Sequence, residues 1–189
     1  MPDICRPWLL ILLALSACAQ SAAPPPQTAA TQVAAPASAR TAWWNDNRWR
    51  YHDEGEADAA YQRLLQQQSA WPEWHQVELV TLPAGLRFEM ALSPGQPPER
   101  PGAFGTFDRI PDVRYVRQRL AVKVAWKPSI DRVATFEIVE PLAADTGTVG
   151  PQIDAQAGYL PGGGSQFEMK VPPAERSRHL KLVAIRPIR

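Results

Sequence analysis

The chain has 189 residues, of which 45% are hydrophobic, and its formal net charge is +1. This length fits one globular domain with an additional anchoring segment. A net charge so close to zero creates no general attraction for nucleic acid, so we expect no nucleic-acid partner.

Several common catalytic and metal-binding motifs are absent from the sequence. It contains no GxxxxGK[ST] phosphate loop, no GxSxG elbow and no HExxH zinc helix. The three histidines, His52, His75 and His179, are dispersed and lack the spacing of metal ligands. We therefore expect neither a metal site nor a bound cofactor.

The first element in chain order is a short apolar run, residues 8–17, which follows Arg6. A helix that spans a bilayer needs about 20 apolar residues, so the run is typical of a secretory signal. The stretch Leu15-Ser16-Ala17-Cys18 resembles the lipobox of bacterial lipoproteins. This resemblance implies that residues 1–17 are removed and that Cys18 carries the lipid. The alternative is an ordinary signal peptide cut at the same small residues.

The use of cysteine agrees with the lipoprotein interpretation. Cys5 would leave with the signal and Cys18 would be acylated, so no thiol would remain for a disulfide, a metal or a nucleophile. Several acyl chains on one residue hold a protein durably on a membrane. Alanine, not aspartate, follows Cys18, and by the same resemblance this implies the outer membrane, facing the periplasm or the cell surface.

Residues 18–42 are rich in Ala, Pro, Ser, Thr and Gln and contain one large apolar residue, Val33. Such a segment cannot bury enough surface to offset the entropy lost on ordering. We expect a tether there, followed by a single domain at residues 43–189.

The domain begins with an aromatic-rich segment, residues 43–74, in which residues 56–68 predict a helix. Its apolar stripe at helical spacing consists of Ala57, Ala60, Tyr61, Leu64 and Leu65. Two interpretations of the tryptophans in this segment are open: they would bind a sugar or a membrane face, or they would pack the helix onto a sheet. We favour packing.

From Val77 onward the hydrophobic period changes from 3.6 to 2, which is typical of half-buried strands. The alternating segments are residues 86–92, 119–126, 134–139 and 166–171, with a further apolar segment at 179–186. We expect loops at 93–105 and 141–164 and a short helix at 111–118. These elements predict an α+β domain in which the N-terminal helix packs on a mainly antiparallel, twisted sheet.

The candidate site lies at the start of the strand predicted for residues 166–171. A period of 2 places Gln166 and Glu168 on the same face of that strand. The turn before it has three glycines, Gly162, Gly163 and Gly164. Glycine lets a ligand approach backbone N–H groups, and an arginine nearby would bind a pyrophosphate with two parallel hydrogen bonds. The alternative is a plain glycine turn that leads into an amphipathic edge strand.

The segments FEIVEPLAADTGTVGP (136–151) and PGGGSQFE (161–168) resemble the TNT family. This family is named for the tuberculosis necrotizing toxin and comprises NAD glycohydrolase domains that are often found in bacterial toxins. The resemblance implies a TNT-like core at about residues 77–189, related to the ADP-ribosyltransferase fold. It also places Gln166 on the glutamine that the family uses at its active site. The matching residues, in order, are Phe136, Pro141, Gly147, Val149, Pro151, Pro161 to Gly164, Gln166 and Phe167.

The first half of the family pattern is matched by Leu82-Pro83-Ala84-Gly85, which corresponds to its LPxG motif. The Asp-Arg-aromatic-Gly motif expected soon after has only a displaced counterpart at residues 101–110. Arg87 and Arg109 are therefore both candidates to bind pyrophosphate. Tyr159, in the predicted loop 141–164, is a candidate to line a groove for the ligand.

The resemblance implies that the protein binds a nucleotide-like ligand and hydrolyses NAD at the nicotinamide–ribose bond. In that reaction Gln166 would orient the substrate or water, and Glu168 would stabilise the ribosyl cation. A periplasmic lipoprotein meets little free NAD, however, so a second class stays open. This is a non-enzymatic envelope lipoprotein that acts as a binding or interaction module, with an immunity-type protein included.

Overall fold

The computed structural model describes residues 37–67 and 69–189. Its helices are α1 (Ala37–Asn47), the 3-10 helix η1 (Arg48–Arg50), α2 (Glu54–Gln66), α3 (Val113–Gln118) and α4 (Arg176–His179). The strands are β1 (Glu78–Leu82), β2 (Arg87–Leu92), β3 (Phe104–Gly105), β4 (Arg132–Ile138), β5 (Leu142–Thr148), β6 (Gln152–Asp154), β7 (Gly158–Leu160), β8 (Ser165–Met169) and β9 (Leu180–Pro187). The predicted signal, Cys18 and the tether as far as residue 36 lie outside the described residues.

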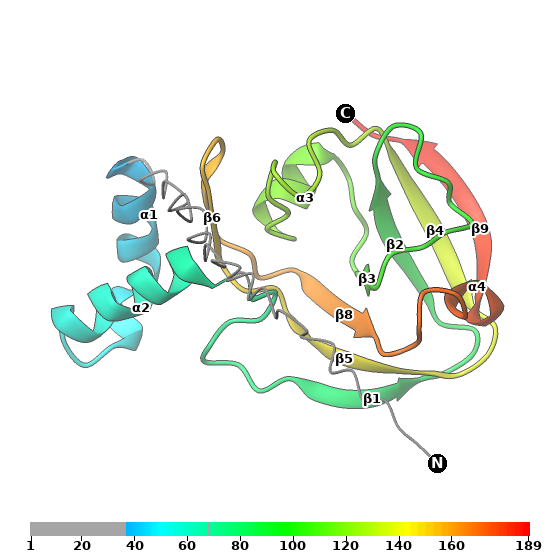
Figure 1. Ribbon diagram of the computed structural model, residues 1–189, viewed down its shortest axis with the longest axis horizontal. Helices are drawn as coiled ribbons and strands as arrows, with labels where there is room; N and C mark the ends of the chain where they lie inside the picture. The colour runs from blue at the N-terminus through cyan, green and yellow to red at the C-terminus, as the bar shows by residue number, and fades with distance from the viewer. Residues whose placement is uncertain (1–36, 68) are drawn as a thin grey trace, which may run out of the picture. The chain divides into compact units, whose positions relative to one another are not determined.

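The strands form three antiparallel sheets, which confirms the α+β class (Figure 1). One sheet has the order β1-β5-β8-β3, the second has the order β2-β4-β9, and β6 pairs with β7 in a two-stranded ribbon. A single bridge between Glu89 and Thr106 joins β2 to the chain just after β3. The two larger sheets are thus linked at the point where polar residues of β2 and β8 lie.

The main core consists of side chains from both larger sheets. Phe88 of β2 stacks on Phe136 of β4 at 5.4 Å between ring centroids, and it meets the edge of Phe167 of β8 at 4.9 Å. Because side chains alternate along a strand, Glu89 and Gln166 point away from the side that these aromatic residues occupy.

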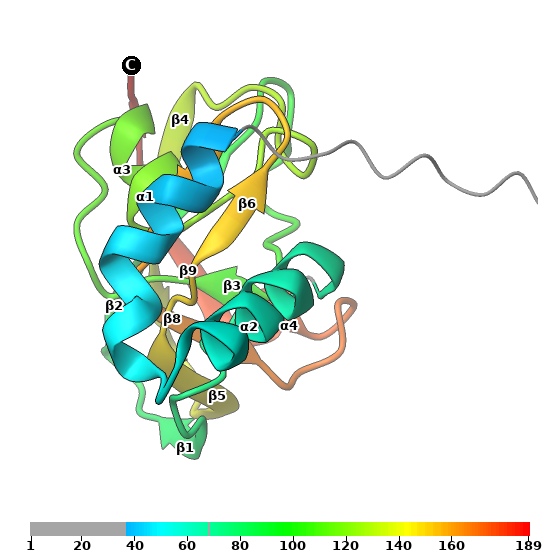
Figure 2. The same ribbon diagram turned by 90° about the vertical axis from the view of Figure 1, so that its left-hand side faces the viewer.

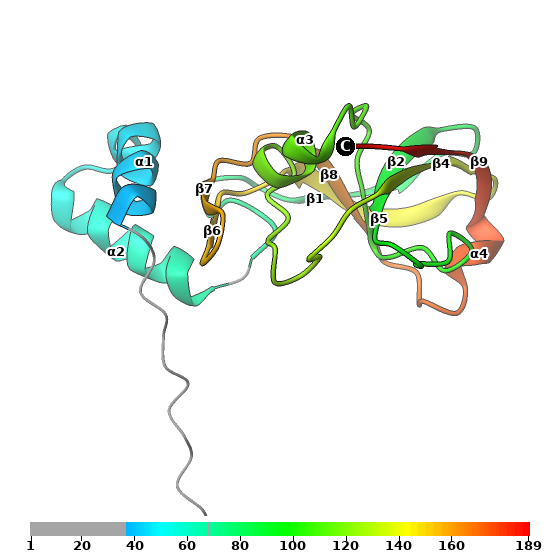
Figure 3. The ribbon, with the colours of Figure 1, turned by 90° about the horizontal axis from the view of Figure 1, so that it is seen from above.

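The helix predicted at residues 56–68 is confirmed as α2, which begins at Glu54. The Asp53 side chain caps it by accepting a hydrogen bond from the Glu56 N–H at 2.9 Å. Helices α1 and α2 pack on the β6–β7 ribbon, as Figures 1 and 3 show. Tryptophan packing, as favoured above, holds for Trp43, which is buried between Tyr51 and Tyr61. Trp49, by contrast, is 69% exposed.

Helix α1 begins at Ala37, inside the segment whose composition predicts a tether (Figure 2). Ala39 and Trp43 are buried one helical turn apart in the cluster that joins α1 to α2 and β6. Tertiary packing therefore stabilises a helix there that alanine-rich, polar composition alone does not indicate.

Two of the predicted elements are wrong. Residues 119–126 form a loop, because the Arg117 guanidinium donates to the carbonyl oxygens of Val122, Lys123 and Lys127 at 2.9, 3.1 and 2.6 Å. Those carbonyls are then not available for a strand partner. The predicted loop 141–164 contains β5, β6 and β7, because pairing with β1 and β8 on either side holds the weakly hydrophobic β5 in place.

The described residues all belong to one compact unit. Every buried cluster of the described residues lies within it. The unit thus has a hydrophobic core of its own and is able to fold as a fragment. None of the described helices is both long enough and apolar enough to span a bilayer.

Candidate functional site

A cavity of about 440 Å³ lies where β2, β3 and β8 meet the loop after α3. We call it the Gln166 cavity. Most of its lining is aliphatic or small, for example Met90, Ile110, Val116, Leu120 and Val149. The polar residues in its lining are Glu89, Gln96, Thr106, Lys127, Gln152, Ser165 and Gln166.

Gln166, the residue that the sequence places at the site, lies in the wall of this cavity. Its backbone pairs with Gly147 of β5, which fixes the side chain on the polar face of β8. The side-chain amide donates one long hydrogen bond, 3.4 Å, to the carbonyl of Ala70. Beside it, the Ser165 and Thr106 hydroxyls are 3.0 Å apart. Gln166 is therefore held only weakly, and its amide can exchange this bond for one to a ligand.

Glu168 shares the polar face of β8 but does not line the cavity. Its neighbours across the sheet are Asp145 on β5 and Phe104 on β3. Its carboxylate lies 4.0 Å from the ammonium of Lys170, which donates to Asp145 at 2.8 Å. Glu168 is therefore not a lining residue of the cavity, although it lies two positions from Gln166 on the same strand face and across from the lining residue Phe104.

The two candidate arginines also lie outside the cavity lining. Arg87 forms an ion pair at 2.8 Å with Glu137, the residue directly across from it on β4. Arg109 is exposed in the segment after β3. Neither guanidinium meets Gln166 at the cavity.

The glycine turn packs against backbone instead of facing a ligand. Gly162 N–H, Gly163 N–H and Gly164 N–H each donate at 2.9 Å to a backbone carbonyl, those of Gln118, Val149 and Arg119. Gly162 has φ +72°, and a Cβ there would lie 2.5 Å from the Val149 oxygen. Glycine is required for this close approach.

Tyr159 lies on β7, against α1, and is not part of the cavity lining. Its hydroxyl accepts a hydrogen bond from the Asn47 side chain at 2.9 Å. Burial raises the pKa of Tyr159 to about 12. These contacts give it a structural role in holding α1 on the ribbon.

Glu89 is a cavity residue that the sequence-based prediction missed. One oxygen of its carboxylate accepts from the Ile110 N–H at 2.7 Å and from the Arg186 guanidinium at 2.8 Å. The Glu89 side chain is 15% exposed. Its position between Phe88 and Met90, on the polar face of an alternating strand, was the available signal. The carboxylate is compensated by Arg186, so it adds little net charge to the cavity.

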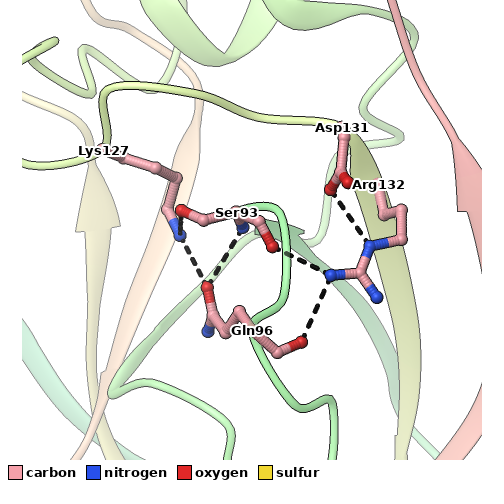
Figure 4. A network of polar contacts seen from close by, with 5 residues as sticks. All are labelled: Ser93, Gln96, Lys127, Asp131 and Arg132. Carbon is pink, nitrogen blue, oxygen red and sulfur yellow. Dashed lines mark hydrogen bonds and ion pairs between the residues drawn. The ribbon is translucent and has the colours of Figure 1, made fainter.

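Lys127 is the second missed residue (Figure 4). Its ammonium donates to the Gln96 side-chain oxygen at 2.9 Å and to the Ser93 hydroxyl at 3.3 Å, and both of these partners are neutral. Arg132 holds the same loop through the carbonyls of Ser93 and Gln96. Burial lowers the pKa of Lys127, and the charge of Arg117 lowers it further. Lys127 is thus a partly buried cation without a carboxylate among these partners.

Two more features of the lining are unusual. Ala121 has φ +46°, a left-handed conformation that costs a residue with a side chain about 1–2 kcal/mol. Gln152 is 1% exposed; its amide nitrogen donates to the Ser69 carbonyl, but its oxygen has no partner in the part of the chain that is described. Backbone strain and unpaired buried polar atoms concentrate at functional sites.

A second cavity, of about 370 Å³, lies next to α2 and is lined by Trp43, Trp71 and Trp74. We call it the tryptophan cavity. Its charged residues are compensated, because the Glu73 carboxylate accepts from the Tyr51 hydroxyl at 2.9 Å and from Arg63 at 3.2 Å. In residues 37–67 and 69–189 no group of three or more His, Cys, Asp or Glu side chains is placed to hold a metal ion.

No family model and none of the curated proteins matches this chain. Among solved structures, a chain in the structure of Tne2 in complex with Tni2 matches with a TM-score of 0.53 and 25% identity. The match covers 63% of this chain and 98% of that chain. The protein is therefore similar in fold to a component of a two-protein complex, and the TNT resemblance of the sequence stays a prediction.

Two further structures match less well. The first is the structure of Tse6 in complex with Tsi6, with a TM-score of 0.39 and 17% identity over 78% of this chain and 95% of that chain. The second is Rhs1-CT in complex with its cognate immunity protein RhsI1, with a TM-score of 0.41 and 14% identity over 60% of this chain and 81% of that chain. Both TM-scores are too low to indicate a shared fold.

Proposed function

We propose that this chain is a binding module of the cell envelope, anchored through Cys18, that holds a ligand in the Gln166 cavity without hydrolysing it. One observation carries the proposal. The cavity brings Gln166 together with Glu89 and Lys127, while Glu168, Arg87 and Arg109 lie outside its lining. The cavity has room for a ligand, but only one of the four side chains expected for NAD hydrolysis, Gln166, lines it.

The chemistry of the reaction explains why this matters. Cleavage of the nicotinamide–ribose bond develops positive charge on the ribose, which a nearby carboxylate would stabilise. The one described carboxylate in the lining, Glu89, is already bonded to Arg186 and to the Ile110 N–H. A pyrophosphate carries two charges, and Lys127 is the one Lys or Arg among the described lining residues.

The test is an incubation of the fragment 33–189 with NAD at high protein concentration, with nicotinamide release as the readout. We expect no release. Release by the wild-type fragment that is lost with Gln166→Ala and kept with Glu168→Gln would overturn the proposal and favour a hydrolase. NAD hydrolysis is the second candidate because Gln166 itself lines the cavity.

A protein partner is a further part of the proposal. The similar chain in the Tne2–Tni2 structure is found in a complex, which supports a partner for this chain, an immunity-type role included. Phe104 and Phe107, on and next to β3, are 43% and 39% exposed and provide an apolar surface beside the cavity. Affinity purification from envelope extracts tests this. A specific partner should be retained by the wild-type fragment and lost with Phe107→Ser.

Lipid anchoring has its own test. Cys18→Ser in the full chain should release the protein from membranes, because the acyl chains would have no attachment site. Continued sedimentation of this variant with membranes would contradict the anchor but would leave the binding function intact.

A further inference from the structure

We infer that the ligand of the Gln166 cavity is a small amphipathic anion, with an apolar body along the aliphatic wall and one carboxylate or phosphate group on Lys127. The inference rests on the proposed binding function and deepens it by naming the chemical class of the ligand. Three properties of the cavity lead to it: its aliphatic lining, its one uncompensated cation and its unpaired amide oxygen.

The aliphatic lining selects for an apolar body. Met90, Ile110, Val116, Leu120 and Val149 contribute branched or flexible apolar side chains to the wall. Ala and Gly residues, together with Phe104, Val122 and Trp126, extend this apolar wall beside the polar residues of the lining. A volume of about 440 Å³ lies within the range of small-molecule sites, about 300–1,000 Å³.

The charge of the lining selects for one anionic group. Glu89 and Arg186 compensate each other at 2.8 Å, so this pair leaves the cavity neutral. Within the described part of the chain, the Lys127 ammonium donates to the neutral side chains of Gln96 and Ser93 and to no carboxylate. The positive charge of Arg117 lowers the pKa of Lys127, but the Arg117 guanidinium itself donates to backbone carbonyls. An anion bound to Lys127 would restore neutrality in a poorly solvated place, where charge-assisted hydrogen bonds are strong.

The side-chain amides of Gln152 and Gln166 favour a ligand that also carries a hydrogen-bond donor. The Gln152 side-chain oxygen is buried and has no partner within the described residues, and an unpaired buried acceptor is costly. A ligand that carries a hydroxyl or amide N–H can satisfy this oxygen. The long bond of Gln166 to Ala70 makes its amide a second adaptable contact.

A dinucleotide fits these properties poorly. Its two phosphates would share the single cation of the lining, and its sugars and bases would present many donors and acceptors to aliphatic side chains. A chain of about ten carbons with one charged end buries its apolar body along the same wall and offers its charge to Lys127, and a hydroxyl group on the chain would also satisfy the Gln152 oxygen.

Isothermal titration of the fragment 33–189 with decanoate, decyl phosphate and decanol, all below their micellar concentrations, tests the inference. We expect at least one of the two anions to bind about tenfold or more tightly than decanol, because hydrogen bonds to charged groups contribute that much. Which anion binds more tightly tells a carboxylate ligand from a phosphate ligand.

Lys127→Met should abolish the preference for the anion while decanol binding is kept, and Lys127→Arg should restore most of it. Lys123→Met is the matched control, because Lys123 lies four residues away over the Trp126 ring and is not part of the cavity lining. Circular dichroism and melting of each variant show whether it is folded.

The outcomes separate the inference from the proposed function. Equal binding of decanoate, decyl phosphate and decanol would overturn the anion inference and leave a cavity that binds apolar ligands. The same conclusion follows if Lys127→Met keeps the preference. If none of the three binds but NAD binds and Gln166→Ala weakens it, the inference fails and the binding function stands. Absence of binding by all four would overturn the inference and count against the cavity as a ligand site.

Discussion

The Gln166 cavity and the tryptophan cavity have similar volumes, about 440 and about 370 Å³, but very different linings. In the tryptophan cavity, Glu73 is bonded to both Tyr51 and Arg63, so its charges are paired. In the Gln166 cavity, Lys127 donates to two neutral side chains and, among the described residues, to no carboxylate. Charge compensation, more than volume, therefore separates a gap between packed elements from a place that attracts a ligand.

The two cavities also differ in how much their lining side chains contribute to the stability of the fold. The tryptophan cavity is bordered by large aromatic residues that hold α1 and α2 on the ribbon. The Gln166 cavity is bordered by aliphatic, small and polar residues, and its polar residues Gln166 and Lys127 are not part of the buried core. Substitutions of the aromatic residues in the first region should mainly change stability, and substitutions of the polar residues in the second should mainly change binding.

The largest effect is expected for Trp43→Ala. Trp43 is 1% exposed and its ring packs against Tyr51 and Tyr61 at 6.0 and 5.2 Å. Its removal should lower the free energy of unfolding by about 3–5 kcal/mol, measured by urea denaturation. Trp49→Ala, at an exposed site where only Arg50 stacks on the ring, should cost at most about 1 kcal/mol. Equal losses would show that the tryptophan cavity is not a packing region.

A smaller effect is expected for Gly150→Ala, which tests the same region through the backbone. A Cβ at Gly150 would lie 2.7 Å from backbone atoms of Trp71 and Pro72, which cannot move without shifting the segment that borders the tryptophan cavity. We expect a loss of about 1–3 kcal/mol. The matched control is Gly102→Ala in the Gln166 cavity, where the nearest atom is the Met90 sulfur at 3.9 Å. A melting temperature that falls equally for both would contradict the comparison.

Periodicity predicted the elements whose core is built from their own alternating side chains. Helix α2 and strands β2, β4 and β8 belong to this group, because each carries large apolar residues at the correct spacing. Strand β5 has few large apolar residues and forms because it pairs on both edges. Likewise, apolar and polar residues alternate in the loop at 119–126 as they do in a strand, but the Arg117 guanidinium donates to its backbone carbonyls, which are then not available for a strand partner.

The candidate site could be predicted only in part. Gln166 was identifiable because its strand and its position on the polar face follow from local sequence. Glu89 and Lys127 reach the same cavity from β2 and from a distant loop, and no local pattern connects residues so far apart in the chain. The three glycines correctly indicated a close backbone approach, but it is the protein's own backbone that approaches, from Val149 after β5 and from the C-terminal end of α3.

The loss of stability in acid should come partly from Asp154, whose carboxylate links the loop at 119–126 to the turn between β6 and β7. Burial by itself would raise the pKa of this carboxyl, but hydrogen bonds from the Ala157, Gln156 and Val124 N–H groups outweigh it, and the pKa lies below the ordinary 3.8. The stabilisation is therefore complete above about pH 4 and is lost as the pH falls through the folded pKa. Melting curves from about pH 7 to about pH 2 should show a steeper acid loss for the wild type than for Asp154→Asn. Identical slopes would rule out this contribution.

The smallest change in stability is expected for Gln166→Ala. Its side chain makes one long hydrogen bond, so we expect a loss below about 1 kcal/mol, with decanoate binding weakened in isothermal titration. Glu168→Gln, two residues along the same strand face, should change neither quantity, because Glu168 is outside the cavity lining. Weaker binding by the Glu168 variant would mean that the site extends beyond the cavity.

The most direct test is a crystal structure of the fragment 33–189 grown with decanoate. We predict density for the carboxylate at the Lys127 ammonium and for the chain along Met90 and Val116, with the tryptophan cavity free of decanoate. Decanoate in the tryptophan cavity, or on the outer surface with the Gln166 cavity unchanged, would contradict the account.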